Sequence, residues 1–270
     1  MTSTSREQDL GYLALRDVAA VRRQLEDGYR IVGGNAVSLL AAAFEVVGVP
    51  ERDTADADVA ADFEVLANPE LLERMAALGY TRDDGSRLSR PLSESERRGY
   101  HGGGASEVPA EVAALRATVD FMGPSLSGRH EPNQEAGDLH VDAFPGVSLA
   151  LAQPAVLVSF NVRLTTGSTF RVSVPLPSPQ SALCLKLLAY RDRLAQKDAV
   201  DVWRLLGVCR EAGLRPGDWR NSGSQGDALT VLWDFVKVGG FGLKSMTPDV
   251  RAHATVRALA LAVAPARSLG

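Results

Sequence analysis

The order of apolar and polar residues predicts that the chain changes character near residue 178. Before that point, stretches with apolar residues every three or four positions alternate with short β-prone runs. The spacing predicts helices over residues 8–27 and 35–47, with Gly28 ending the first. Between them, residues 29–32 are a β-prone run that ends in two glycines, which predicts a strand leading into the second helix.

Three further segments of the first part have clear patterns. Residues 54–65 alternate acidic and small apolar positions, and this period of two is typical of a strand. Asn68 and Pro69 open a helix that ends at Gly79. Residues 117–122 are β-prone and predict another strand.

Polar stretches separate these elements. Residues 83–107 are rich in Ser, Arg and Gly, and residues 123–138 are also polar, so both are expected to be loops. Two β-prone runs, at 156–164 and 169–174, flank a Thr-Gly-Ser turn and predict a hairpin.

The second part is predicted to be helical. Pro175, Pro177 and Pro179 punctuate a linker. Helical spacing then returns in four segments, at 181–194, 199–212, 228–238 and 248–263. The sequence therefore predicts an α+β protein, in which a mixed-sheet domain at 1–178 is followed by a helical domain at 179–270.

Composition narrows the class of protein without changing this outline. Of 270 residues, 45% are hydrophobic and 23% are charged, and the net charge of −4 means that a nucleic acid would have to meet a local basic patch. Cys184 and Cys209 form no disulfide or metal motif, and the four histidines lack the spacing of a zinc site. The N-terminus has no apolar signal core and no apolar tract is long enough to span a bilayer, so we expect a cytoplasmic protein without membrane contact.

Two acids in one predicted strand carry the most specific chemistry. Asp56 and Asp58 project from the same face of that strand, so their carboxylates repel unless a cation lies between them. Mg²⁺ prefers such hard oxygen ligands together with substrate phosphates. Asp120 is the best third acid because it stands alone in an apolar run, and Asp142 is the alternative. In phosphoryl chemistry with two Mg²⁺ ions, one holds a triphosphate and the other lowers the pKa of the attacking hydroxyl.

The glycines that end the first predicted strand suit a phosphate. Gly33 and Gly34 stand between a β-run and a helix, where glycine lets the backbone approach a phosphate closely and the helix N-terminus donates N–H groups. Alone, such a pair is only a strand-to-helix turn. One helix before the strand with two acids, it indicates a phosphate-binding loop beside a metal site.

Together these elements resemble the polymerase-β-like nucleotidyltransferases. Their order is Gly-Gly-x-Ala, a helix, Arg-x-Thr-x-Asp-x-Asp over residues 52–58, and a later strand with one acid. Residues 183–191 (LCLKLLAYR), residues 197–201 (KDAVD) and the run TVDFMGP at 118–124 are similar to the AbiEii/MenT-type toxin group. The resemblance spans roughly residues 10–210.

The resemblance implies an activity and a setting. Such proteins transfer a nucleotide from a nucleoside triphosphate, some of them to the 3′ end of tRNA, and are commonly toxins neutralised by an antitoxin protein encoded beside them. For this chain it implies that Asp56, Asp58 and Asp120 hold two Mg²⁺ ions and that Lys186 completes the catalytic set. The implied nucleotide-binding residues are Gly33, Gly34, Thr54, Arg191, Asp198 and Asp201, with the helical domain closing the nucleotide cleft.

The chain departs from the family at the glycines. Many nucleotidyltransferases have Gly-Ser where this chain has Gly33 and Gly34. The hydroxyl contact to the triphosphate then has to come from backbone N–H groups or from Ser38.

Several of these charged residues also fit a purely structural role. Lys186 fits either a phosphate contact or a lysine whose ammonium reaches solvent. Asp198 and Asp201 suit the cap and third position of a helix, or one of them orients Lys186 or Arg191. Basic residues that could meet an RNA backbone, or simply be solvated, are Arg82, Arg87, Arg90, Arg97, Arg98, Arg191, Arg193 and Lys197.

Two other functions fit the same motifs. One is a nucleotidyltransferase that modifies a small molecule of the aminoglycoside kind, or a protein side chain. The other is a non-catalytic protein that keeps the nucleotide pocket and regulates a partner.

Overall fold

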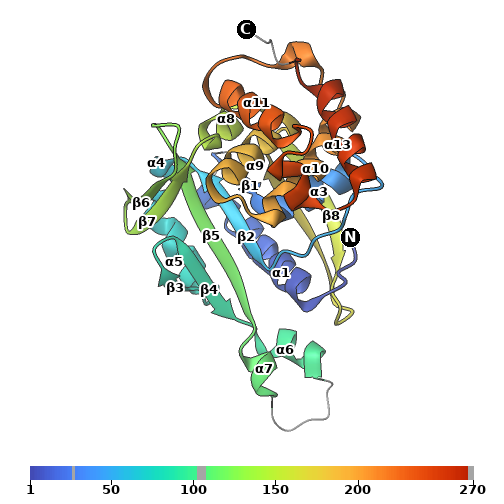
Figure 1. Cartoon of the computed structure of the whole chain (residues 1–270). Coiled ribbons are helices and arrows are strands. Elements are labelled where there is room, and N and C mark those ends of the chain that lie inside the picture. The colour runs from blue at the N-terminus through green and yellow to red at the C-terminus, as the bar shows by residue number, and fades with distance from the viewer. Residues whose placement is uncertain (26–27, 102–107, 267–270) are drawn as a thin grey trace.

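The fold combines a mixed sheet with a layer of helices (Figure 1). A computed structural model describes residues 1–25, 28–101 and 108–266. The strands of the main sheet are β1 (Tyr29–Val32), β2 (Asp56–Ala61), β3 (Thr81–Asp84), β4 (Arg87–Pro91), β5 (Arg116–Pro124), β6 (Glu131–Ala136) and β7 (Leu139–Phe144).

The strand order positions β2 and β5 in the middle of the sheet. Within the described ranges the order is β1-β2-β5-β4-β3, with β7 pairing with β5 and with β6. β2 runs parallel to β5, whereas β1 and β4 run antiparallel to these neighbours. The sheet is therefore mixed, and the predicted α+β class is confirmed.

The helices form two groups in the chain, one before the hairpin at residues 156–176 and one after it. The first group is α1 (Arg6–Ala20), α2 (Arg22–Leu25), α3 (Gly33–Ala43), α4 (Phe63–Leu66), α5 (Pro69–Ala77), α6 (Glu94–His101), α7 (Ala110–Ala113) and α8 (Val147–Ala152). A two-stranded hairpin of β8 (Val156–Arg163) and β9 (Thr169–Leu176) follows, as predicted. The second group is α9 (Pro179–Arg193), α10 (Gln196–Glu211), α11 (Gly223–Phe235), α12 (Phe241–Met246) and α13 (Val250–Val263), with a 3₁₀ turn at Pro216–Asp218.

Local signals explain the elements that the sequence predicts well. α5 begins with Pro69 at its first position, where the missing N–H costs nothing, and the Asn68 side chain accepts from the Glu70 N–H at 3.0 Å. β1 leads directly into α3, as the strand-Gly-Gly-helix pattern predicts.

Two segments that were predicted to be loops contain regular elements. Residues 83–107 include the end of β3, β4 and α6, and residues 123–138 include β6, so the loop prediction is wrong there. β3 is exposed at every position and β6 is buried only at its last, which removes the alternation that identifies a strand. Residues 102–107 of the first segment lie outside the described residues.

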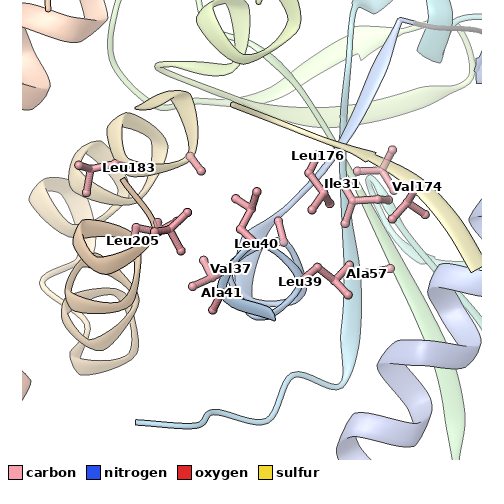
Figure 2. Close-up of a cluster of buried hydrophobic side chains, with 14 of the residues drawn as sticks. Ile31, Val37, Leu39, Leu40, Ala41, Ala57, Val174, Leu176, Leu183 and Leu205 are labelled. Carbon is pink, nitrogen blue, oxygen red and sulfur yellow. The ribbon is translucent and has the colours of Figure 1, made fainter. Parts of the chain in front are cut away.

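α3 is held between the sheet and the C-terminal helices (Figure 2). Leu39 faces the sheet side, near Ala57 of β2, while Val37 faces Leu205 of α10. These side chains are almost completely buried, and a buried leucine contributes about 1.5–3 kcal/mol relative to an exposed one. Packing on both sides fixes the N-terminus of α3, which carries the two glycines.

No helix in the described part of the chain combines the length and the apolar character needed to cross a membrane.

Candidate active site

A cavity of about 280 Å³ lies between the main sheet and the helices α9 and α10. Its wall is made by segments that are far apart in the sequence. The glycine, charged and hydroxyl-bearing residues that line it are Gly33, Gly34, Arg52, Thr54, Asp56, Asp58, Arg87, Asp120, Lys186, Asp192, Arg193, Lys197 and Asp198.

The strand registers bring three of these residues into one row across the sheet. Asp58 pairs with Val32 of β1 on one side and with Asp120 of β5 on the other. Asp120 in turn pairs with Arg87 of β4. Neighbouring strands lie about 4.8 Å apart, so the carboxylates of Asp58 and Asp120 face the cavity side by side. Asp56 lies two positions before Asp58 and on the same face.

Burial and the charge of a neighbouring acid raise the pKa values of Asp58 and Asp120. Burial, and then the charge of Asp56, raises the pKa of Asp58 to about 7, although the charge of Lys186 opposes the shift. Burial also raises the pKa of Asp120, although the Ser86 hydroxyl, which donates to its carboxylate at 2.7 Å, opposes the rise. Neighbouring carboxylates with raised pKa values are typical of sites that meet a cation or a proton during function.

The chemistry of the three acids fits a divalent cation. Carboxylate oxygens are preferred ligands of Mg²⁺, and a cation would remove the repulsion that raises the pKa of Asp58. In the described ranges, no group of three or more His, Cys, Asp or Glu side chains is already arranged to hold a metal ion. Mg²⁺ commonly takes only one or two carboxylates and keeps several waters, so a ready-made set of three is not required.

Asp142, the alternative third acid, lies outside the lining of this cavity. It pairs with Met122 in the register of β5 and β7. Its carboxylate contacts the imidazole of His130 at 2.9 Å and accepts from the Asn133 N–H at 3.1 Å. Of the two candidates, Asp120 is therefore the one that reaches the cavity.

The two glycines are required by close packing at the start of α3. Gly33 has a φ of +68°, and a Cβ atom there would overlap the carboxylate of Asp58. A Cβ atom at Gly34 would overlap Arg52 and the hydroxyl of Thr54. Among the described residues, no side chain caps the N-terminus of α3, so its first N–H groups are open toward the cavity. Backbone N–H groups and the helix dipole make such an end suited to an anion.

Thr54 presents an unpaired hydroxyl at the same place. Its Oγ1 is buried and has no hydrogen-bond partner in the described part of the chain, although it lines the cavity. A buried hydroxyl without a partner is uncommon and indicates a missing ligand or water. Ser38, the other hydroxyl considered, lies outside the cavity lining and accepts from Arg204 at 3.2 Å.

Lys186 reaches the cavity from α9 and is only 7% exposed. Its ammonium lies 2.9 Å from Asp201 and 3.3 Å from Asp198, both on α10 and both completely buried. The two carboxylates neutralise the lysine, whose burial without a counter-charge would be strongly unfavourable. The ammonium of Lys186 is therefore not solvent-exposed, as one of the two interpretations had it. Its contacts agree with the other expectation, that the acids orient it.

The capping interpretation of these acids is wrong. α10 begins at Gln196 with Ala195 as its cap, three residues before Asp198, so Asp198 is at the third helical position and Asp201 at the sixth. Asp201 lies outside the cavity lining, behind Lys186, and also binds Arg52 at 3.0 Å.

Arg191, predicted to bind the nucleotide, does not line the cavity. It lies in a neighbouring polar pocket, where its Nε donates to Asp192 at 2.7 Å. Two positions further on, Arg193 lines the cavity and binds Asp198 at 3.0 Å. Lys197 also lines it.

The arginines between residues 82 and 98 do not form one basic patch. Arg90 is buried against Asp17 and Glu96. Arg98 pairs with Glu94 on the surface of α6. Arg87 alone of this group lines the cavity.

Sequence reasoning missed the cavity role of three residues. Arg52 is the first residue of the motif that ends with the two acids. Its spacing from Asp58 in the sequence could therefore have suggested that it lines the cavity. Arg87 was named only as one of several basic residues that could meet RNA, and its position opposite Asp120 could not be predicted because it depends on a β-hairpin that was not predicted. Asp192 had no signal either, since it follows Arg191 in an ordinary helix end.

Comparison with solved structures finds a likeness to an antigenic nucleotidyltransferase-like protein from Paracoccidioides brasiliensis. The two chains are 16% identical with a TM-score of 0.43, over 90% of this chain and 97% of that one. No family model matches the sequence, and no curated protein matches it. A likeness at this level does not establish a function, which has to be inferred from the residues of this chain.

Proposed function

We propose that this chain is a nucleotidyltransferase, dependent on Mg²⁺, that transfers a nucleotide from a nucleoside triphosphate to an acceptor hydroxyl. The observation that carries the proposal is the meeting of Asp56, Asp58 and Asp120 in one cavity with the open N-terminus of α3. Acids that attract a divalent cation lie beside N–H groups that attract a phosphate.

The glycine turn is the proposed polyphosphate site. Gly33 and Gly34 let the phosphates approach the backbone closely, and the N–H groups at the start of α3 donate to them. The unpaired hydroxyl of Thr54 supplies the contact that serine provides in relatives with Gly-Ser. A volume of about 280 Å³ is near the small end of ligand pockets, roughly 300–1,000 Å³, and suits a polyphosphate with the base toward the rim.

The acids are proposed to hold two Mg²⁺ ions. Asp56 and Asp58 would bind both, and Asp120 would complete the site next to the acceptor. When bound, the cations supply neutralising charge for the phosphates and lower the pKa of the acceptor hydroxyl. Deprotonated carboxylates are needed for this, so the raised pKa of Asp58 makes cation binding weaker below about pH 7.

Lys186 is proposed to act together with the two acids behind it. Asp198 and Asp201 fix its ammonium at the cavity wall, where its charge opposes the rise in the pKa of Asp58. Arg193 and Lys197 also line the cavity and are the candidates for contacts with the leaving phosphates.

The acceptor and the biological setting are the finer part of the proposal. The resemblance to the AbiEii/MenT-type group suggests the 3′ end of tRNA as acceptor and an antitoxin as partner. Exposed Arg87 and Lys197 at the cavity favour an acceptor with phosphates over a polycationic aminoglycoside.

Transfer of label tests the proposal. The protein is incubated with Mg²⁺ and each α-labelled nucleoside triphosphate in turn, with total tRNA, an aminoglycoside or protein as acceptor. We expect label on tRNA, and Asp58→Asn should lower the rate at least about 100-fold. Asp62→Asn is the matched control, because Asp62 is exposed and caps no N–H group with its side chain.

Each remaining outcome of this experiment identifies one of the alternatives. Label on the aminoglycoside or on protein would replace tRNA as acceptor and keep the activity. Nucleotide binding without transfer to any acceptor would favour a regulatory protein. Toxicity on expression that a co-expressed neighbouring reading frame relieves would support the toxin setting.

A further inference from the structure

A second, larger cavity lies on the C-terminal helices and shares no lining residue with the first. It has a volume of about 810 Å³ and is formed by α12, α13 and the turn before α12. Figure 1 places α13 at the edge of the helical layer, away from β5. We name this cavity the C-terminal groove.

The C-terminal groove gathers apolar side chains that a folded chain normally buries. Val238 is 74% exposed, Val250 is 73% exposed and Leu261 is 58% exposed, and all three line it. Single exposed apolar residues are ordinary, but several around one concave surface indicate a binding site.

The charges of the C-terminal groove are of one sign. Lys244 and Arg257 are the charged residues that line it, and none of its described lining residues is acidic. The nearest acid in the sequence, Asp249, already accepts from the Arg251 N–H at 2.9 Å as the cap of α13. A basic groove stands out on a chain whose net charge is −4.

We propose that the C-terminal groove binds an amphipathic helix with acidic flanks from a partner protein. The apolar stripe of such a helix would cover Val238, Val250 and Leu261, and its carboxylates would meet Lys244 and Arg257. Helices bind grooves between two helices in this way, with apolar residues at spacings of three and four. Charge complementarity adds specificity and speeds association.

Two other occupants fit these observations less well. A symmetric pair of copies would bring the same surface together, so the basic residues Lys244 and Arg257 would face a surface of the same sign. An anionic membrane would accept basic and apolar side chains, but it needs a protruding face, whereas these residues line a concave one.

Binding of designed peptides tests the proposal with the full chain. The probes are a 20-residue helix with a leucine stripe and glutamate flanks, the same helix with lysine flanks, and a scrambled acidic peptide, each carrying a fluorophore. We expect the acidic helix to bind at least 10-fold more tightly than either of the others. Hydrogen exchange should then slow over residues 238–261.

Variants locate the site on exposed positions, where folding is least affected. Val250→Ser and the charge reversal Lys244→Glu should each weaken binding of the acidic helix at least 5-fold. Val47→Ser, at an apolar residue that is 84% exposed elsewhere, should leave it within 2-fold of the wild type.

Four results would overturn the proposal. These are equal binding of the acidic and lysine-flanked helices, no binding of either, binding that Val250→Ser and Lys244→Glu leave unchanged, and a dimer that Val250→Ser dissociates. Binding to phosphatidylcholine–phosphatidylglycerol vesicles in place of the acidic helix would assign the groove to a membrane.

Discussion

Two clusters of buried and half-buried charged residues in this molecule differ in whether their charges are matched. The anchor cluster consists of Arg16, Asp17, Arg90 and Glu96 and joins α1, β4 and α6. Within it, Arg90 donates to Asp17 at 2.6 Å and to both oxygens of Glu96 at 3.0 Å. The cavity cluster consists of Asp56, Asp58 and Asp120, three groups of the same charge that cannot balance one another.

The two clusters move the pKa of a carboxyl in opposite directions. Burial opposes ionisation of Glu96, but hydrogen bonds from Arg90 and Arg16 outweigh it and lower its pKa to about 2. Burial and Asp56 raise the pKa of Asp58 to about 7. Removing one member of a matched buried set is costly because it leaves an uncompensated charge, whereas an unmatched set already costs stability and is retained where a ligand supplies the balance.

The largest expected effect on stability comes from breaking the anchor cluster. Arg90→Met leaves the partly exposed Arg16 as the remaining cation beside the two acids Asp17 and Glu96, which should lower the free energy of unfolding by about 3 kcal/mol or more. Urea unfolding measures it. Arg98→Met is the control, since its exposed pair with Glu94 is worth little, about 0–1 kcal/mol. Equal effects of the two substitutions would contradict the distinction between matched buried charge and surface charge.

The opposite result is expected in the cavity cluster. Asp58→Asn removes a repelled carboxylate, so it should stabilise the protein without divalent cations by roughly 2–4 kcal/mol at pH 8. A carboxyl with a raised folded-state pKa loses its favourable contribution as the pH rises through about 7. The gain should therefore shrink toward pH 4. Thermal unfolding at the two pH values measures it, and a destabilised variant at pH 8 would argue against unbalanced charge.

A smaller effect on stability is expected from the contact between the glycine turn and the acids. Gly33→Ala should cost about 1–2 kcal/mol because of the positive φ, and the overlap of its methyl group with the carboxylate of Asp58 should add roughly 1 kcal/mol. In the background of Asp58→Ala most of the overlap is gone, so the cost should fall toward that of the backbone alone. A double-mutant cycle of unfolding free energies measures the difference. Additive effects would mean that residues 33 and 58 do not press on one another.

The sequence predicted the elements whose signals are local. β1, β2 and α5 follow from alternation, glycines and a proline cap, each readable within a few residues. Asp56 and Asp58 share a face for the same reason. The strands β3, β4 and β6 were not predicted, because polar residues at most of their positions hide any alternation. The position of Arg87 opposite Asp120 depends on β4 and was therefore not predicted either.

The partners of Lys186 show a second limit. The sequence suggested that a buried lysine needs an anion, with a triphosphate as the favoured one and Asp198 or Asp201 as an alternative partner. The structure shows that both acids contact Lys186, from a helix that packs beside α9. Which side chains meet across two packed helices depends on their relative rotation, and no pattern within one helix contains that information.

Cation binding tests the central claim most directly. Mn²⁺ titrated into the protein with a non-hydrolysable nucleoside triphosphate analogue can be followed by electron paramagnetic resonance, without any assumption about the acceptor. We predict that the wild type binds Mn²⁺ and that an Asp56→Asn and Asp58→Asn double variant binds it at least 10-fold more weakly. Equal binding by both proteins, or none by the wild type, would contradict a cation site at these acids.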